Sequence, residues 1–271
     1  MKEIGFLRPL QHQYAHPITY YALLDQTQIP LNPLLGNKIH ITYMGEKACC
    51  HCGRKIKKTY NNGYCYRCFK VLPENDLCIV KPNLCHFDQG TCRDDTFGEQ
   101  YCMQKHYVYL ALSSDVKVGI TRKENAFRRW MDQGAVSALP IAELPNRKSA
   151  GELEIYLSQY VADRTNWRKM LKNEIVPKNL EEVRESLYEV IPEKFQTYLL
   201  TDEPVQQFTY PSLATPEKIT ALNLDKEPKV TGLLLGIKAQ YLILDTGVLN
   251  MRRHAGYKVT FAVSSQHTLF S

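Results

Sequence analysis

Cysteine is the residue type whose number and spacing point most directly to chemistry in this chain. All nine cysteines lie between Cys49 and Cys102. Four of them form two C-x2-C pairs with twelve residues between the pairs: Cys49, Cys52, Cys65 and Cys68. Two such pairs can direct four thiolates at one tetrahedral ion. The spacing therefore predicts a structural Zn²⁺ site of the zinc-ribbon type, with reduced, unligated cysteines as the alternative.

A second group of cysteines is spaced less regularly. Gaps of six, six and nine residues separate its members, which are Cys78, Cys85, Cys92 and Cys102. We predict a second structural Zn²⁺ site from them, with His86 and His106 as further candidate ligands. The alternative is that they are ordinary buried cysteines in a small core. Cys50 is then left over, and an odd number of cysteines fits disulfide pairing poorly.

The composition excludes several classes of protein. In 271 residues, 44% are hydrophobic and 23% are charged, which is typical of a globular protein and excludes bulk disorder. There is no run of 18 apolar residues, so no membrane-spanning helix is expected. The N-terminus lacks the apolar stretch of a secretory signal, and we expect a cytoplasmic protein. The net charge of +6 permits an anionic partner but does not require one.

Both ends of the chain are predicted to be rich in β-structure. Runs of β-branched and aromatic residues predict strands at 18–24, 38–43, 229–236, 241–245 and 257–261. Neither end has enough strands for a barrel of its own, so we expect both ends to contribute to one β-domain. The predicted ranges are a β-rich segment at 1–45, a cysteine-rich zinc-binding region at 46–105, an α/β core at 106–195 and a C-terminal β-domain at 196–271.

The sequence of the α/β core predicts a β-hairpin followed by helices. Strands are expected at 106–112 and 116–120, joined by a tight turn at 113–115. Apolar side chains at helical spacing then predict three helices. These are a helix around Phe127–Met131 that ends near Gly134, one with a stripe from Leu153 to Val161, and one between the N-cap Asn179 and Pro192.

Several short motifs of this core resemble those of the GIY-YIG nuclease superfamily. They are Tyr107-Val108-Tyr109, Lys117-Val118-Gly119-Ile120-Thr121, Arg128-Arg129-Trp130, and Leu153-Glu154 with Asn166 twelve residues later. The lysine that opens the second motif and the paired arginines are most similar to the phage-type branch. With the cysteine-rich region in front, the whole chain is similar to an uncharacterised family defined only as a domain of unknown function.

The resemblance implies a role for each matching residue. Tyr109 would lie near the attacking water, and Arg128 or Arg129 would stabilise the charge that develops on phosphorus. Glu154 would hold one divalent ion, Mg²⁺ or Mn²⁺. Asn166 would orient the site. Taken singly, each residue also has an ordinary explanation: core packing for the tyrosine, and solvated helix faces for the arginines and the glutamate.

Lys117 departs from the repair-type members of the superfamily, which have a tyrosine there. The lysine could contact phosphate or act as a base, or it could mark a site that binds and no longer cuts. The phage-type branch shares this lysine. Asp163 and Arg164, close to Asn166, are candidates to support the site.

The predicted fold class is α+β, with zinc-ribbon-containing, β-rich ends around a small GIY-YIG-like mixed α/β core. We expect a zinc-stabilised protein that associates with DNA or RNA, not with membranes, and acts as a divalent-metal-dependent phosphodiesterase. The alternatives are a non-catalytic DNA- or RNA-binding module with a degenerate site, and a protein-interaction scaffold. The hairpin between the C-x2-C pairs could contact phosphates and bases through Arg54, Lys55, Lys57, Lys58, Tyr60, Tyr64 and Tyr66, or it could simply be solvated.

Overall fold

The computed structural model describes residues 1–162 and 164–264 of the chain. It is a mixed α+β structure that divides into two compact units. Unit 1 combines Met1–Phe69 with the chain from Thr209 onward, and unit 2 is Lys70–Phe208. Within the described residues, no helix is long and apolar enough to cross a membrane.

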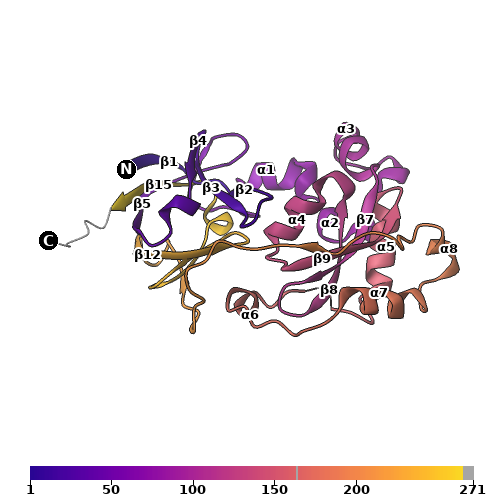
Figure 1. Ribbon diagram of the computed structural model, residues 1–271. Helices are drawn as coiled ribbons and strands as arrows, with labels where there is room; N and C mark the ends of the chain where they lie inside the picture. The colour runs from indigo at the N-terminus through magenta and orange to yellow at the C-terminus, as the bar shows by residue number, and fades with distance from the viewer. Residues whose placement is uncertain (163, 265–271) are drawn as a thin grey trace. The chain divides into compact units, whose positions relative to one another are not determined.

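Unit 1 is built around a sheet to which both ends of the chain contribute (Figure 1). Its strand order is β1 (Lys2–Phe6), β15 (Tyr257–Ser264), β5 (Lys38–Ala48), β12 (Lys229–Lys238), β13 (Tyr241–Leu244), β14 (Gly247–Asn250) and β11 (Ala221–Leu222). The short β6 (Lys55–Ile56) also pairs with β5. The pairs are antiparallel except β11 with β14, which is parallel.

Strand β5 illustrates why these segments form a sheet. Ile39 and Ile41 are fully buried, while His40 between them is only partly covered. A period of two places alternate side chains on opposite faces of a sheet, so β5 has one core face. The strand predicted at 38–43 is confirmed and runs on to Ala48, the residue before the first C-x2-C pair.

A second, small sheet completes the β-structure of unit 1. It consists of β2 (Gln11–Gln13), β3 (Thr19–Leu24) and β4 (Thr27–Pro30). The strand predicted at 18–24 corresponds to β3. The remaining elements of this unit are the short helices η1 (Asn32–Leu34) and η7 (Arg252–His254), with α1 (Tyr66–Val71) at its boundary.

Unit 2 contains a four-stranded antiparallel sheet with the order β10 (Gln206–Gln207), β9 (Ser137–Leu144), β7 (His106–Leu112) and β8 (Val116–Arg122). The predicted hairpin is confirmed, since β7 and β8 pair along their whole length. Its helices are α2 (Leu77–Val80), α3 (Asp95–Phe97), α4 (Ala126–Asp132), α5 (Arg147–Leu157), α6 (Trp167–Leu171), α7 (Leu180–Tyr188) and α8 (Glu193–Gln196), with short turns η2 (Pro73–Asn75), η3 (Pro82–Leu84), η4 (Phe87–Gln89), η5 (Gly98–Cys102) and η6 (Lys123–Asn125).

The two faces of the unit 2 sheet are covered differently. Val108, Leu110 and Leu112 of β7 belong to a core that includes apolar side chains of α5 and α7. Tyr109 lies between them in sequence and therefore points to the other face, where its ring meets Trp130 of α4 edge to face at 5.8 Å. The alternation of β7 thus directs Tyr109 to the face that α4 covers.

The helix boundaries follow local signals with one exception. The side chain of Asn179 caps α7 by accepting a hydrogen bond from Glu181 N at 2.9 Å, as predicted. The stripe predicted from Leu153 to Val161 is wrong at its end, because α5 stops at Leu157. The chain leaves the helix there and runs beside β8, where Val118 N donates to Ala162 O at 2.9 Å.

Candidate functional site

The first cysteine cluster brings four sulfur atoms together in unit 1. The Sγ atoms of Cys49, Cys52, Cys65 and Cys68 all lie within 4.8 Å of one another. Those of Cys52 and Cys65 are 3.9 Å apart. Four thiolates in one small space repel each other, so a cation among them is what allows all four to ionise. The arrangement could hold a metal ion and suits zinc with four sulfur ligands.

A short turn positions the first pair of these cysteines, and the start of α1 positions the second pair. Cys49 directly follows β5, and Gly53 closes the first turn with φ +70° while its N–H donates to Cys49 O at 3.0 Å. Burial would raise the pKa of the Cys49 thiol, but the backbone hydrogen bonds around the sulfur lower it to about 6. Such N–H donors are the usual support of a metal-bound thiolate. The site is therefore preorganised for an ion by the backbone itself.

The hairpin between the two pairs turns at Asn61-Asn62-Gly63, a run of residues that is typical of a hairpin tip. Asn61, Asn62 and Gly63 all have positive φ, and Tyr60 N donates to Tyr64 O at 2.8 Å across the turn. Cys50 stands outside the four-sulfur cluster. Cys50 packs against the tip of the hairpin. A Cβ atom added to Gly63 would lie only 2.5 Å from the Cys50 Sγ.

The second group of cysteines gathers around one small cavity in unit 2. Its volume is about 10 Å³, room for a single water-sized occupant, and it is lined by Cys78, Cys85, Cys92 and Cys102. Three of these cysteines are buried and pack with Phe87, Phe97 and Met103. Within the same cavity wall, ligand atoms of Asp76, Cys78 and His86 lie within 4.8 Å of one another. The cavity thus offers more ligands than one tetrahedral ion needs.

The two histidines near this cavity are placed differently. His86 lines the cavity, with Nδ1 2.8 Å from Thr91 Oγ1 and Nε2 3.7 Å from Asp76 Oδ2. His106 is fully buried at the start of β7, where its Nδ1 lies 2.7 Å from Gln104 O. Burial lowers the pKa of His106 to about 4. Of the two candidate ligands, the structure brings His86 to the cysteines.

Tyr109 and Arg129 meet on the sheet face covered by α4. The Tyr109 hydroxyl donates to Gln133 Oε1 at 2.9 Å. Arg129 remains exposed overall, but its guanidinium group hydrogen-bonds the same hydroxyl. Burial raises the pKa of Tyr109, against the opposing charge of Arg129. The phenol is therefore held in its neutral form, with Arg129 fixed beside it.

Gly119 makes room for the tyrosine. It pairs with Tyr109 across the β7–β8 ladder, and a Cβ on Gly119 would lie 2.7 Å from the Tyr109 hydroxyl. The glycine of the second motif is thus required by a close approach of side chain to backbone.

A pocket of about 250 Å³ lies beside these groups in unit 2. Arg129 and Glu154, which were predicted as site residues, both line it. The other residues that line it are Ile79, Val80, Pro82, Ile120, Thr121, Arg122, Asn125 and Arg147. Three guanidinium groups and one carboxylate thus converge on a single pocket, and such a combination suits a phosphate group and a cation.

Two of these arginines carry no sequence signal that singles them out as site residues. Arg122 ends β8, forms an ion pair with Glu124 at 2.5 Å and stacks its guanidinium 4.3 Å from the centre of the Tyr101 ring. Arg147 is the first residue of α5, and its Nη2 donates to Ile79 O at 2.7 Å.

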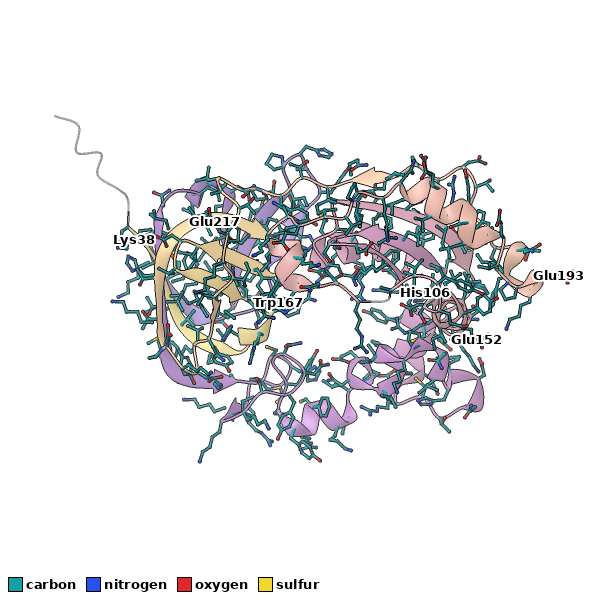
Figure 2. All side chains as sticks on the ribbon, turned by 90° about the horizontal axis from the view of Figure 1, so that it is seen from below. Lys38, His106, Glu152, Trp167, Glu193 and Glu217 are labelled. Atoms are coloured by element: carbon teal, nitrogen blue, oxygen red, sulfur yellow. The ribbon has the colours of Figure 1, made fainter. Side chains whose placement is uncertain are left out.

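The remaining predicted residues do not line this pocket. Lys117 is buried in β8, next to a bridge with Ala162. Arg128 is exposed on α4. Asn166 caps α6, its Oδ1 accepting from Arg168 N and Lys169 N at 3.2 Å each; Trp167, labelled in Figure 2, begins that helix. Arg164 is exposed, and Asp163 lies outside the described residues.

The basic hairpin of unit 1 offers a separate charged surface. Its four cationic side chains are exposed: Arg54, Lys55, Lys57 and Lys58. Lys58 Nζ lies 5.2 Å from the centre of the Tyr60 ring, which stacks on Phe69 at 5.7 Å. Tyr66 keeps 59% of its surface exposed. Cations and an accessible ring thus lie on one short segment of the chain.

Comparison with known proteins places the chain in a family. The model of the family described as "Protein of unknown function (DUF2797)" matches residues 36–259. Because this match covers most of its length, the chain belongs to the DUF2797 family. No curated protein and no solved structure matches it.

Proposed function

We propose that this DUF2797 protein is a zinc-stabilised phosphodiesterase that cleaves DNA or RNA with the help of a divalent cation, in the manner of GIY-YIG nucleases. The observation that carries the proposal is the pocket in which Arg129 and Glu154 meet beside Tyr109. The order of β7, β8, α4, β9 and α5 supports it, because the tyrosine, glycine, arginine and glutamate of the motifs follow in the superfamily's order along those elements.

Arg129 is the residue suited to bind the scissile phosphate. Its fixed guanidinium fork can donate two hydrogen bonds to phosphate oxygens and stabilise the charge that builds up there. Its hydrogen bond to the Tyr109 hydroxyl holds the group in place before substrate arrives. If the neutral Tyr109 hydroxyl gives up its hydrogen bond to Gln133, it can donate a hydrogen bond to a substrate oxygen in the pocket instead.

Glu154 is the residue suited to hold a divalent cation. Its carboxylate is half-buried and lines the pocket, and carboxylate oxygen is the ligand that Mg²⁺ and Mn²⁺ prefer. When bound, such an ion would polarise the phosphate and favour departure of the leaving oxygen. Glu154 would fix the cation on the pocket side of α5, while the arginines bind the phosphate oxygens.

The zinc ions of the proposal are structural. Four sulfur ligands close the coordination of the first cluster and leave no position for substrate. We assign a second zinc ion to the cavity lined by Cys78, Cys85, Cys92 and Cys102. Elemental analysis tests both assignments: two zinc ions per chain are expected, and one ion per chain would remove the second site.

Cleavage is tested by comparing two glutamates of α5. We expect the purified protein to cut single- or double-stranded DNA or RNA in Mg²⁺ or Mn²⁺, and Glu154→Ala to abolish the cut while zinc content and circular dichroism stay unchanged. Glu152→Ala is the matched control, because Glu152 lies on the same helix, is exposed and pairs with Lys194 at the surface at 3.5 Å (Figure 2). Cleavage that survives Glu154→Ala would rule out this mechanism.

A non-catalytic DNA- or RNA-binding module is the second candidate. It is favoured by the placement of Lys117, which is buried away from the pocket, and of Asn166, which caps α6. In this case the pocket binds a phosphate and no bond is broken. Salt-sensitive binding of an oligonucleotide that stays intact through long incubation with Mn²⁺ would favour this candidate.

A further inference from the structure

Arg147 lies between the second cysteine cluster and the pocket. On one side it lines the pocket with Arg129 and Glu154. On the other side its charge interacts with the sulfur atoms of Cys102 and Cys78. No motif of the superfamily resemblance includes this arginine, and it joins two features that the sequence presents as separate.

The guanidinium group of Arg147 is only partly satisfied. Its Nη2 donates to Ile79 O at 2.7 Å, while its Nε–H is buried and has no hydrogen-bond partner among the described residues. A buried guanidinium without enough acceptors is costly unless a negative group comes to it. The charge of Glu154 already acts on it, and two further sources of negative charge could do so: an anion bound in the pocket and the thiolates of a metal-bound cysteine cluster.

A close backbone contact also links the second cysteine cluster to the pocket. Gly151 of α5 packs so closely on η3 that a Cβ would lie 2.5 Å from Pro82 Cβ and 2.6 Å from Asn83 N. Turn η3 lies between Cys78 and Cys85, and Pro82 itself lines the pocket. A metal ion that fixes these cysteines therefore also fixes η3, and through it the helix that carries Arg147 and Glu154.

We propose that Arg147 is a phosphate-binding residue of the pocket and that a metal ion in the second cysteine cluster holds it in that position. The ligand class is a phosphate monoester or diester. A zinc ion held by four thiolates would carry net negative charge and would offset the charge of Arg147, while the part of the guanidinium group that lines the pocket is left to bind a phosphate oxygen. This inference rests on the phosphate-binding pocket of the proposed function but not on cleavage.

The first test measures binding of thymidine 3′,5′-bisphosphate to the full-length, zinc-loaded protein without Mg²⁺, by calorimetry. Arg147→Met is expected to weaken binding about tenfold or more, the size of a missing charge-assisted hydrogen bond. Arg147→Lys keeps the charge but loses the planar guanidinium group, so its affinity for the bisphosphate should lie between those of the wild type and Arg147→Met. Lys148→Met is the matched control, because it removes the same charge from the next residue, which pairs with Asp88 at the surface. Unchanged binding by Arg147→Met would overturn the proposal.

The second test uses the wild-type protein and therefore does not depend on a cysteine variant that folds. Zinc is titrated away by an equilibrium competition with a chromophoric chelator, with and without saturating bisphosphate. Linkage requires that, if zinc in the second cluster tightens bisphosphate binding, bisphosphate tightens that zinc by the same factor. We expect bisphosphate to raise the affinity of the protein for one of the two zinc ions, and we expect Arg147→Met to abolish this increase. If bisphosphate leaves the zinc affinity unchanged in the wild type, the coupling is refuted.

The outcomes separate this inference from the proposed function. If bisphosphate binds as described but no oligonucleotide is cut, cleavage fails while the role of Arg147 stands. If oligonucleotides are cut but Arg147→Met binds bisphosphate as well as the wild type does, the proposed function stands and this inference fails. If the wild type does not bind bisphosphate, the inference is overturned whatever the cleavage assay gives.

Discussion

The two cysteine clusters differ in how their ligands are brought together. In unit 1, Cys49 and Cys52 lie on one turn, Cys65 and Cys68 lie at the start of α1, and the hairpin between the pairs brings them together. In unit 2, the four cysteines are spread over 25 residues from Cys78 to Cys102, with Cys78 in α2, Cys102 at the end of η5, and Cys85 and Cys92 in the irregular segments between them. The first cluster could therefore form from a short piece of chain, while the second depends on how that segment packs.

The clusters also differ in their surroundings. The segment that carries the second cluster supplies Ile79, Val80 and Pro82 to the pocket lined by Arg129 and Glu154. Regular spacing thus marks a site that can fold locally, whereas irregularly spaced ligands can belong to a site that depends on the rest of the unit.

The largest effect is expected from Cys65→Ser in the first cluster. Structural zinc contributes on the order of 10 kcal/mol to the folding of small metal-dependent modules, so removal of a ligand should unfold the hairpin and release one ion. Elemental analysis and proteolysis between the C-x2-C pairs check this. Cys50→Ser is the matched control, since Cys50 lies outside the cluster. If Cys65→Ser keeps both ions and resists protease, the site is not closed by these four thiols.

Acid should destabilise unit 2 through His106. Burial lowers the pKa of this group to about 4 from 6.5, so the unfolded chain binds a proton more readily below pH 6.5. Its contribution, about 3 kcal/mol in all, is complete above pH 6.5 and is lost as the pH falls toward 4. Urea unfolding at pH 7.5 and pH 5 should therefore show a smaller loss of stability in His106→Gln than in the wild type. Equal losses would mean that metal release alone governs acid unfolding.

A methyl group on Gly151 should disturb the second cluster and spare the first. The added Cβ would clash with Pro82 and Asn83, and overpacking of this kind costs about 1–3 kcal/mol. We expect Gly151→Ala to bind one of the two proposed zinc ions more weakly in the chelator competition. Gly63→Ala is the converse, because its Cβ would meet Cys50 at the tip of the first hairpin. If both variants weaken the same ion, the two clusters are not independent.

The smallest effect is expected at the basic hairpin. Replacing Lys57 and Lys58 by Gln should lower the salt dependence of oligonucleotide binding by about one in log–log slope for each phosphate that the hairpin no longer binds. Cleavage of bound substrate should be unaffected, since the hairpin carries no pocket residue. Lys226→Gln, at another exposed lysine of unit 1, is the control. An unchanged slope would assign the hairpin a purely structural role.

Local elements were predictable because their signals are local. The β7–β8 hairpin, the Asn179 cap and the turn at Asn61–Gly63 each depend on residues close together in sequence. The end of α5 was not predictable, because Leu157 is followed by a suitable apolar stripe and only the bridge of Ala162 to β8 draws the chain away. Helical spacing of apolar residues identifies one face of a helix, but it does not reveal that a nearby strand can pair with the same segment.

The candidate site was predictable in part. Motif order pointed to Tyr109, Arg129 and Glu154, and these three lie near one another. It did not point to Arg122 or Arg147, which reach the pocket from the end of β8 and the start of α5. Residues that join a pocket only through packing leave no spacing for a motif to record.

The sequence alone predicts the four-sulfur site from paired spacing, the β7–β8 hairpin, and the start of α7 at the Asn179 cap. These properties depend on contacts within a few residues, where the chain has few alternatives. The tertiary structure was needed to show that β15 lies between β1 and β5, that four irregularly spaced cysteines line one cavity, and that Arg147 lines the pocket. Such contacts join residues far apart in sequence, and the free energy that selects them comes from the packing of the whole unit.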